Sequence, residues 1–399
     1  MAVHEIGKSM NLFNQYTEGD VFLASPGKTL LGEGTLAVLN EEEQKGMKVE
    51  EKVYRLIEIA KEKGSTNPVV AGAIPFDISK PAKLMVPLHS YFDETKQPKI
   101  EEEAGIMTNH FSIVPVPGEA VFEKGVSTCV EYIKAGILKK AVLGRTLLVH
   151  QDEPVRIQPL LGRLLDANPS GYTFAIPIQN EGEPQKTLIG ASPELLVSKK
   201  GTTLHANPLA GSRPRSNDPA EDRRRAEELL VSEKDLYEHS VVVQAVEAAL
   251  EPLSRSLHVP DNPSVIATET MWHLSTEITG EILNADVHSI DLAAALHPTP
   301  AVCGTPVNQA FRFIKEIEPF DRGFFTGMIG WSDENGDGEW AVTIRCAEAE
   351  GNTLRLFAGA GIVGDSQPEE ERKETGAKFQ TMLQALGLGS SEEREEKTC

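Results

Sequence analysis

Apolar runs of strand length recur along this 399-residue chain without alternating regularly with helices. Four of them lie in the first half, at residues 69–75, 141–149, 173–178 and 187–191, and each is compact enough for one strand. Parallel strands need a long crossover between them, usually a helix. The order of the runs therefore predicts an α+β fold with mostly antiparallel sheet.

The last quarter contains the strongest short-range signal in the chain. Asn335-Gly336 lies between two apolar runs, residues 324–331 and 339–348, and Asn-Gly in that setting predicts a hairpin. We expect residues 353–358 to form another strand.

Helical patterns are clearer in the second half of the chain than in the first, which is predicted to form mainly short strands and turns. Asp218-Pro219 combines an N-cap residue with proline at the first helical position and predicts a helix start, and residues 233–250 carry a periodic apolar stripe. Ser366 and Glu369 have the spacing of a capping box for a helix that runs to about residue 386.

Composition limits the classes of partner and the number of domains. Without a long Pro/Gly/Ser linker, we expect one large domain over residues 1–389 and a disordered polar tail over 390–399. The formal charge of −21 argues against binding to nucleic acid or anionic membranes.

The same composition predicts a cytoplasmic protein. The four cysteines show no CxxC pair, so we expect reduced thiols. No run approaches the roughly 18 apolar residues of a membrane span, and residues 1–12 have no signal-peptide pattern.

Two familiar motifs are excluded by their context. Residues 359–364 match GxGxxG after a strand, but too little chain follows for a dinucleotide-binding unit. Its glycines still leave backbone N–H groups accessible to an anion. Residues 333–338 resemble a calcium loop, but the position that should hold glutamate is Ile344, so a hairpin turn is favoured.

Acidic residues on two helices form a candidate metal site. Glu371, Glu374 and Lys378 stand at i, i+3 and i+7, so they share one helix face, and Asp235 and Glu238 form a similar pair. A solvated acidic face is the ordinary alternative. If the faces meet, Glu238 and Glu374 would supply two oxygen donors suited to Mg²⁺.

Four further positions could bind or activate a substrate. Arg345 lies in a strand-like run and needs an anionic partner, either a substrate carboxylate or a structural group. Lys140 precedes an apolar strand and would be a usable base if buried, although most lysines are exposed. Glu194 lies among apolar residues, where burial would raise its pKa and suit it to an acid role. His273 could equally be a core histidine.

Taken together and in this order, the segments resemble the chorismate-utilising enzyme family of anthranilate, aminodeoxychorismate, salicylate and isochorismate synthases. The resemblance spans roughly residues 65–388. It implies one large domain of two packed, mostly antiparallel sheets surrounded by helices. The segments that carry it are residues 139–145, 190–196, 208–215, 233–239, 296–304, 343–345, 357–363 and 372–378.

The resemblance implies a magnesium-dependent enzyme that acts on chorismate. By position, Glu238 and Glu374 would hold Mg²⁺ against the ring carboxylate of chorismate. Glu371 and Asp235 would lie just outside the metal or reach it through water.

The remaining substrate contacts follow from the same resemblance. Arg345 and the Gly359 backbone would bind the enolpyruvyl carboxylate. Gly211, His273 and Lys378 would lie near the metal-bound carboxylate.

Single positions distinguish the branches of the family. Lys140 is similar to the lysine of the water-using members, and Ala210 replaces the lysine of aminodeoxychorismate-type members. Phe325 and Ala301 stand where salicylate synthases and other lyase members usually have tyrosine and threonine. The pattern resembles isochorismate synthases of the 2,3-dihydroxybenzoate siderophore branch.

The activity implied is reversible conversion of chorismate to isochorismate, with Lys140 as base for water and Glu194 as acid for the C4 hydroxyl. A salicylate synthase and a menaquinone-branch isochorismate synthase are the alternatives. A downstream isochorismatase could take the product, and no glutaminase subunit is expected.

Overall fold

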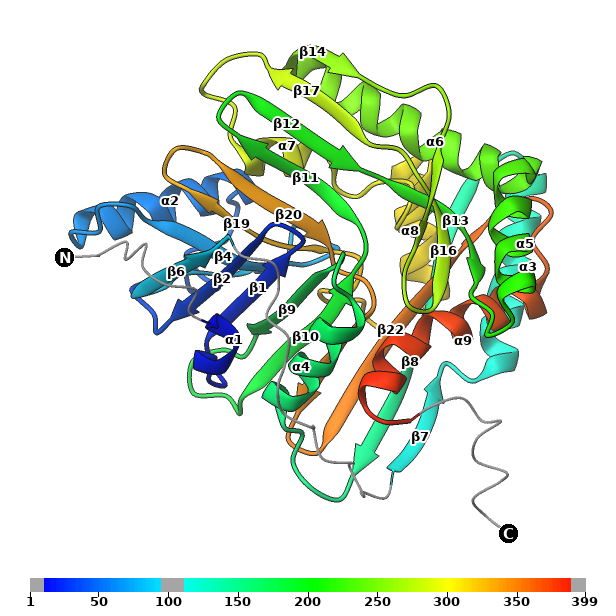
Figure 1. Cartoon of the computed structure of the whole chain (residues 1–399), viewed down its shortest axis with the longest axis horizontal. Coiled ribbons are helices and arrows are strands. Elements are labelled where there is room, and N and C mark those ends of the chain that lie inside the picture. The colour runs from blue at the N-terminus through cyan, green and yellow to red at the C-terminus, as the bar shows by residue number, and fades with distance from the viewer. Residues whose placement is uncertain (1–10, 95–110, 389–399) are drawn as a thin grey trace.

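Two large antiparallel sheets dominate the computed structural model, which describes residues 11–94 and 111–388 (Figure 1). In this part of the chain the first sheet has ten strands, with β7 (Phe111–Val116) beside β8 and the others in the order β18 (Gly304–Thr305), β8 (Lys140–Gln151), β22 (Thr353–Ile362), β21 (Cys346–Glu350), β10 (Lys186–Ser192), β9 (Tyr172–Pro177), β1 (Val21–Ser25), β2 (Lys28–Glu33), β6 (His89–Asp93).

The second sheet and a small third sheet complete the strands. Among the described residues, the second sheet runs in the order β14 (Ser254–His258), β17 (Ile278–Ile282), β12 (Thr203–Asn207), β11 (Leu195–Lys200), β20 (Gly338–Val342), β19 (Met328–Asp333), β4 (Val69–Ile74), β5 (Lys83–Val86), β3 (Ala37–Val38). The third has the order β13 (Leu209–Pro214), β16 (Met271–Ser275), β15 (Ser264–Ala267). The expected α+β class is confirmed, with this third sheet in addition to the two predicted.

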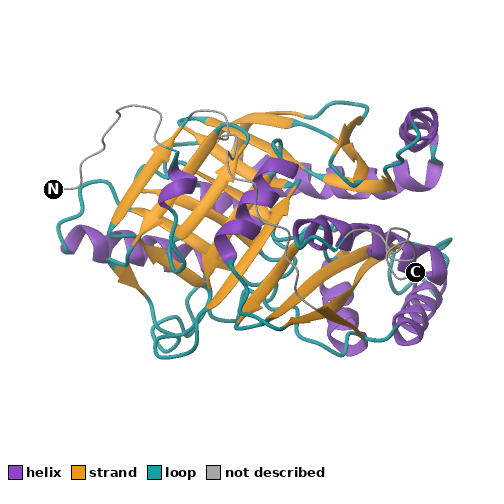
Figure 2. Ribbon diagram, turned by 60° about the horizontal axis from the view of Figure 1, so that its bottom comes forward, coloured by secondary structure: helices purple, strands orange, loops and turns teal. Residues whose placement is uncertain are grey.

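Helices pack against the large sheets (Figure 2). Those that cover the outer face of the second sheet are α2 (Val49–Glu62), α6 (Glu233–Leu250) and α7 (Ser289–Leu296). The outer face of the first sheet is covered by α1 (Leu12–Gln15), α4 (Ile157–Ala167) and α9 (Pro368–Ala385). Near β8 lie α3 (Glu119–Lys134) and α8 (Val307–Ile317), α5 (Pro219–Val231) lies beside β13, and the short 3₁₀ turn η1 (Glu251–Leu253) follows α6.

The apolar runs are continuous because both faces of each large sheet are buried. In β4, Val69 and Ala71 face the first sheet, whereas Val70 and Ile74 face the helices. Side chains alternate between the two faces of a strand, so a strand buried on both sides needs apolar residues at every position.

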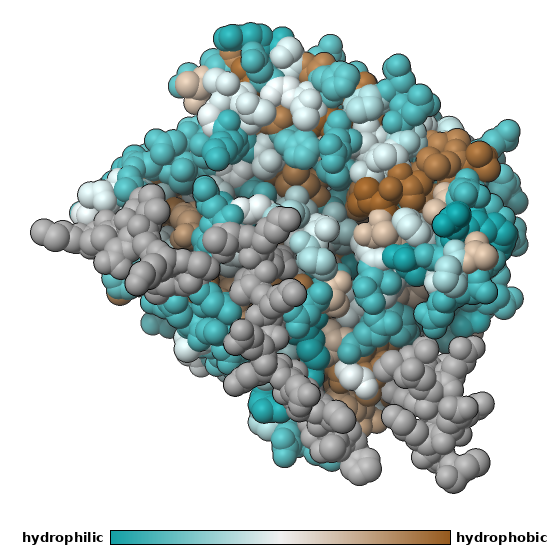
Figure 3. Space-filling model, viewed as in Figure 1, coloured by the Kyte–Doolittle hydropathy of each residue, from teal (hydrophilic) through white to brown (hydrophobic). Residues whose placement is uncertain are grey.

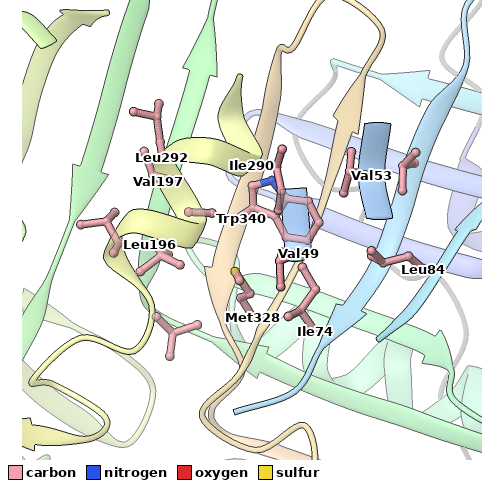
Figure 4. Packing of buried hydrophobic residues seen from close by; sticks show 14 of the residues in the cluster. Val49, Val53, Ile74, Leu84, Leu196, Val197, Ile290, Leu292, Met328 and Trp340 are labelled. Carbon is pink, nitrogen blue, oxygen red and sulfur yellow. The ribbon is translucent and has the colours of Figure 1, made fainter. Parts of the chain in front are cut away.

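The largest buried side chain anchors the second sheet to its helices. Trp340 of β20 is fully buried, and Figure 4 shows its ring between Ile290 of α7 and Val49 of α2, close to Ile74 and Met328. Its indole N–H donates to Ser332 Oγ at 3.2 Å, which satisfies the one polar atom of the ring.

Most predicted boundaries agree with the structure. The 335–336 hairpin joins β19 to β20 in register, and Asp218 caps α5 by accepting from the N–H groups of Ala220 and Glu221. The capping box at Ser366 was wrong. Gln367 is the N-cap of α9, and the Ser366 hydroxyl instead accepts a hydrogen bond from the Val363 N–H at 3.1 Å.

Two predicted strands change their extent. The run at 339–348 is divided between β20 and β21, which belong to different sheets, and Arg345 between them has a left-handed φ of 52°. The strand expected at 353–358 continues to Ile362 as β22, which places Gly359 inside a sheet.

The surface is mainly polar on the face in Figure 3, where apolar residues gather in a band near α5 and α6. No helix within residues 11–94 and 111–388 has the length and apolar character to cross a bilayer. The predicted tail at 390–399 and most of the segment searched for a signal peptide lie outside the described residues.

Candidate active site

The candidate site lies where the chain crosses twice between the large sheets. Pro193-Glu194 joins β10 of the first sheet to β11 of the second, and residues 343–345 join β20 of the second to β21 of the first. Each crossing accepts a backbone hydrogen bond from a strand that the other crossing connects. Val342 N–H donates to the Glu194 carbonyl at 3.0 Å, and Ala191 N–H donates to the Arg345 carbonyl at 3.1 Å.

A cavity at these crossings gathers most of the predicted site residues. Three others, Lys140, Asp235 and Glu371, lie outside its lining. The predicted residues that line the cavity are Glu194, Gly211, Glu238, His273, Ala301, Arg345, Gly359, Glu374 and Lys378.

A larger and more open groove lies elsewhere, lined by residues such as Lys28, Tyr172 and Trp331. It contains none of the predicted site residues. Size is therefore a poor guide here, and we place the candidate site in the smaller cavity because buried acidic and basic groups converge there.

Glu194 has the properties of a proton donor near neutral pH. Its side chain is only 3% exposed, and burial raises its pKa to about 7, against the opposing effects of the Leu209 N–H and the charges of Lys140 and Lys378. The Leu209 N–H lies 3.5 Å from Glu194 Oε1. A carboxyl with this pKa is present in both protonation states at pH 7.

Lys140 begins β8 and is also buried, with 1% of its surface exposed. Its Nζ lies 2.8 Å from Glu238 Oε1, but this contact lacks hydrogen-bond geometry, and Nζ has no hydrogen-bond partner among the described residues. Buried polar atoms are nearly always hydrogen-bonded, so the Lys140 amine can accept a further partner such as water.

Gly361 allows this contact to form. A Cβ at this position would overlap Glu238 Oε1 and lie 3.0 Å from Lys140 Cε. Gly361 was not among the predicted site residues. Its signal was the glycine-rich run at 359–364, whose glycines provide space beside β22 rather than a dinucleotide-binding turn.

The four acidic residues predicted at or near the metal are each paired with a cation, as Glu238 is with Lys140. Glu374 Oε1 lies 2.6 Å from Lys378 Nζ and accepts from Ser212 Oγ at 3.0 Å. The other pairs are Glu371 with Lys234 at 3.2 Å and Asp235 with Arg213 at 2.6 Å. Ser212, Arg213 and Lys234 were not predicted as site residues, although the first two lie in the glycine-containing 208–215 loop.

The two glutamates of α9 respond differently to burial. Burial raises the pKa of Glu371, and the charge of Glu374 raises it further. Burial also opposes ionisation of Glu374, but the charge and hydrogen bond of Lys378 lower its pKa overall. Glu374 is therefore the stronger ligand candidate of the two.

The donor set fits a cation that keeps most of its coordination positions for other ligands. No group of three or more His, Cys, Asp or Glu is arranged as a metal site in the described part of the chain. Glu238 and Glu374 nevertheless both line the cavity. Mg²⁺ commonly takes only one or two protein carboxylates and keeps waters or substrate oxygens, so two donors are sufficient.

Arg345 is a buried cation oriented by its neighbours. Burial lowers its pKa to about 10, so the guanidinium remains charged at neutral pH. Its Nη1 donates to the Lys378 carbonyl at 3.2 Å, and Nη2 lies 3.3 Å from His273 Nε2. Burial and the charge of Arg345 hold the pKa of His273 well below its usual value, so neutral His273 accepts from Arg345.

Backbone groups complete the cavity wall. The Gly359 carbonyl accepts from Lys378 Nζ at 2.9 Å, and because the N–H and C=O of one strand residue point the same way, the Gly359 N–H also faces the cavity. Gly211 has φ +79°, and a Cβ there would come within 3.1 Å of Asp235 Cβ. Ala301 lies in the loop between α7 and β18.

Comparison with known proteins agrees with this arrangement. Residues 83–387 match the family model described as chorismate binding enzyme. The chain is 51% identical over 385 residues to isochorismate synthase DhbC of Bacillus subtilis (strain 168), covering 96% of this chain and 97% of that protein. It is 42% identical over 374 residues to the vibriobactin-specific isochorismate synthase of Vibrio cholerae, covering 94% and 93%.

A solved structure extends the likeness to three dimensions. The crystal structure of DhbC from Bacillus anthracis matches with a TM-score of 0.88 and 53% identity, covering 95% of this chain and 99% of that one. The chain belongs to the chorismate-binding enzyme family.

Proposed function

We propose that this chain is an isochorismate synthase of the 2,3-dihydroxybenzoate siderophore branch. The observation that carries the proposal is a cavity lined by a buried acid, Glu194, and the Arg345 cation, with the buried amine of Lys140 directly behind Glu238 of its lining. The similarity to DhbC and to the vibriobactin-specific enzyme supports both the reaction and the branch.

The proposed reaction moves a hydroxyl around the chorismate ring. Water attacks ring C2 while the Lys140 amine takes a proton from it. The ring double bonds shift, and the C4 hydroxyl leaves as water after Glu194 donates its proton. Each positioned proton-transfer group contributes on the order of 10²–10⁴-fold to the rate.

Two anionic groups of the substrate need cationic or polar partners. Arg345 and the Gly359 N–H can bind the enolpyruvyl carboxylate, and His273 holds the Arg345 guanidinium in orientation. We propose that Glu238 and Glu374 hold Mg²⁺, with Glu371 and Asp235 behind them. The ion would neutralise the ring carboxylate as electron density shifts through the ring. The cytoplasmic location, the single domain to residue 389 and a downstream isochorismatase remain predictions.

Product analysis tests the proposed function directly. The enzyme, chorismate and Mg²⁺ should give isochorismate as the main product by liquid chromatography, with little pyruvate. Stoichiometric release of pyruvate would instead indicate a salicylate synthase. A product containing nitrogen when ammonium is added would indicate an ammonia-using synthase. An unchanged chorismate peak would reject all three reactions.

Lys140→Met should lower kcat by about 10²–10⁴-fold because it removes the base for water. The measurement is initial isochorismate formation at saturating chorismate. Lys139→Met is the matched control, since Lys139 is the exposed neighbour of Lys140 and should leave kcat unchanged. Turnover of Lys140→Met near that of the control would contradict the assignment of the base.

Glu194 predicts a specific pH dependence. Its pKa of about 7 means that the acid is protonated below pH 7 and ionised above it, so kcat/KM should fall as pH rises through about 7. Glu194→Gln should be strongly impaired and lose this limb. Glu339→Gln is the control, because Glu339 has a raised pKa through burial but lines the other groove. A basic limb near pH 7 that persists in Glu194→Gln would assign it to another group.

Glu374→Gln should weaken Mg²⁺ binding by about 100-fold or more, because it removes one of two proposed carboxylate ligands. Calorimetric titration of Mg²⁺ into the protein measures the effect without turnover. Glu370→Gln is the control, since Glu370 lies on the exposed side of α9 and pairs with Lys373. Equal Mg²⁺ affinity in the two variants would argue against a metal at Glu374.

A further inference from the structure

A buried ion pair that contains none of the predicted site residues lies behind the cavity wall. Arg322 and Glu318 are each 3% exposed at the side chain, and Arg322 Nη2 lies 2.6 Å from Glu318 Oε1. A second bond joins Arg322 Nε to Glu318 Oε2 at 2.8 Å. The pair is therefore bidentate, a geometry that fixes the guanidinium plane.

The remaining donors of Arg322 reach three separate segments of chain. Nη2 donates to the Val142 carbonyl of β8 at 2.7 Å. Nη1 donates to the Val302 carbonyl at 2.8 Å and to Thr326 Oγ1 at 3.1 Å. Glu318 adds a fourth connection, because its Oε1 accepts from the Gly144 N–H of β8 at 2.6 Å.

All three segments form one wall of the candidate cavity. Val142, Val302 and Thr326 each line it, together with Phe325. The Arg322 guanidinium also lies over the Phe325 ring, 5.7 Å from its centroid. Arg322 and Glu318 do not line the cavity themselves, so the pair holds these three segments from outside it.

The stability of the core alone gives no reason for a charged pair at this position. Replacing a buried ion pair with well-packed apolar residues is often neutral or stabilising. Apolar contacts have no preferred direction, so an apolar cluster can shift. The hydrogen bonds of one planar guanidinium hold two carbonyl oxygens and one hydroxyl oxygen at fixed relative positions.

We propose that Arg322, held by Glu318, is a positioning residue that fixes the Val142–Val302–Thr326 wall against the bound ring. This inference rests on the proposed function. Arg322 donates to none of Arg345, Gly359, Glu238 or Glu374, so substrate affinity should depend little on it. Small displacements of a reacting group can cost about 10²-fold in rate, so its loss should appear in kcat.

Arg322→Lys is the test, since lysine keeps the charge opposite Glu318 but cannot bond all three segments from one planar group. We expect kcat to fall about 10- to 100-fold, because misplacing a reacting group by about 1 Å can cost about 10²-fold in rate. KM should change less than threefold. Lys199→Gln is the matched control. It removes the ion pair of buried Lys199 with partly exposed Asp337 at 2.8 Å, in the lining of the other groove, and should lower the melting temperature but not kcat.

A kcat of Arg322→Lys within twofold of the control would overturn the proposal, as would a rise in KM with kcat unchanged. If that variant does not fold, Glu318→Gln decides by the same criteria, because the amide keeps an acceptor for the Gly144 N–H but not the charge. The wild-type product is identified in the same assay. A wild-type product other than isochorismate would reject the proposed function, while the kcat and KM comparison still tests the role of Arg322.

Discussion

The site depends on one constraint, which is that two sheets buried on both faces are joined by short segments in which the chain crosses from one sheet to the other. At a crossing the backbone cannot continue either ladder, so side chains there point neither to solvent nor into a regular layer. Glu194 lies at one crossing and Arg345 at the other, and backbone bonds hold the crossings together. A buried carboxyl and a buried guanidinium thereby line one cavity.

Burial of so many charged groups is tolerated because each has a counter-charge or a dipole. Lys378 neutralises Glu374, Lys234 neutralises Glu371, and Arg213 neutralises Asp235. Lys140 differs from these lysines, since its contact with Glu238 is close but not hydrogen-bonded. An amine that is buried and incompletely satisfied is available for chemistry in a way that the paired lysines are not.

Local sequence patterns correctly predicted those elements whose turns and caps depend on interactions between neighbouring residues. The Asn335-Gly336 turn and the Asp218 cap depend only on neighbouring backbone, and both agree with the structure. Ser366 failed because Gln367 became the N-cap and the serine hydroxyl bonds instead to Val363. Arg345 was predicted to be part of a strand because the residues on either side of it, 340–347, are mostly apolar, and an apolar run does not show where a chain changes sheets.

By itself the sequence determined the mostly antiparallel α+β class and the acidic faces of two helices, because these follow from the order of the apolar runs and from spacing, and its resemblance to the chorismate-utilising enzymes indicated the site residues. Only the tertiary structure decided how those residues meet. The space left by Gly361, the orientation of Arg345 by His273 and the wall held by Arg322 all arise from contacts between segments far apart in the chain. Spacing along one segment contains no information on such contacts, since they depend on which sheets and helices pack together.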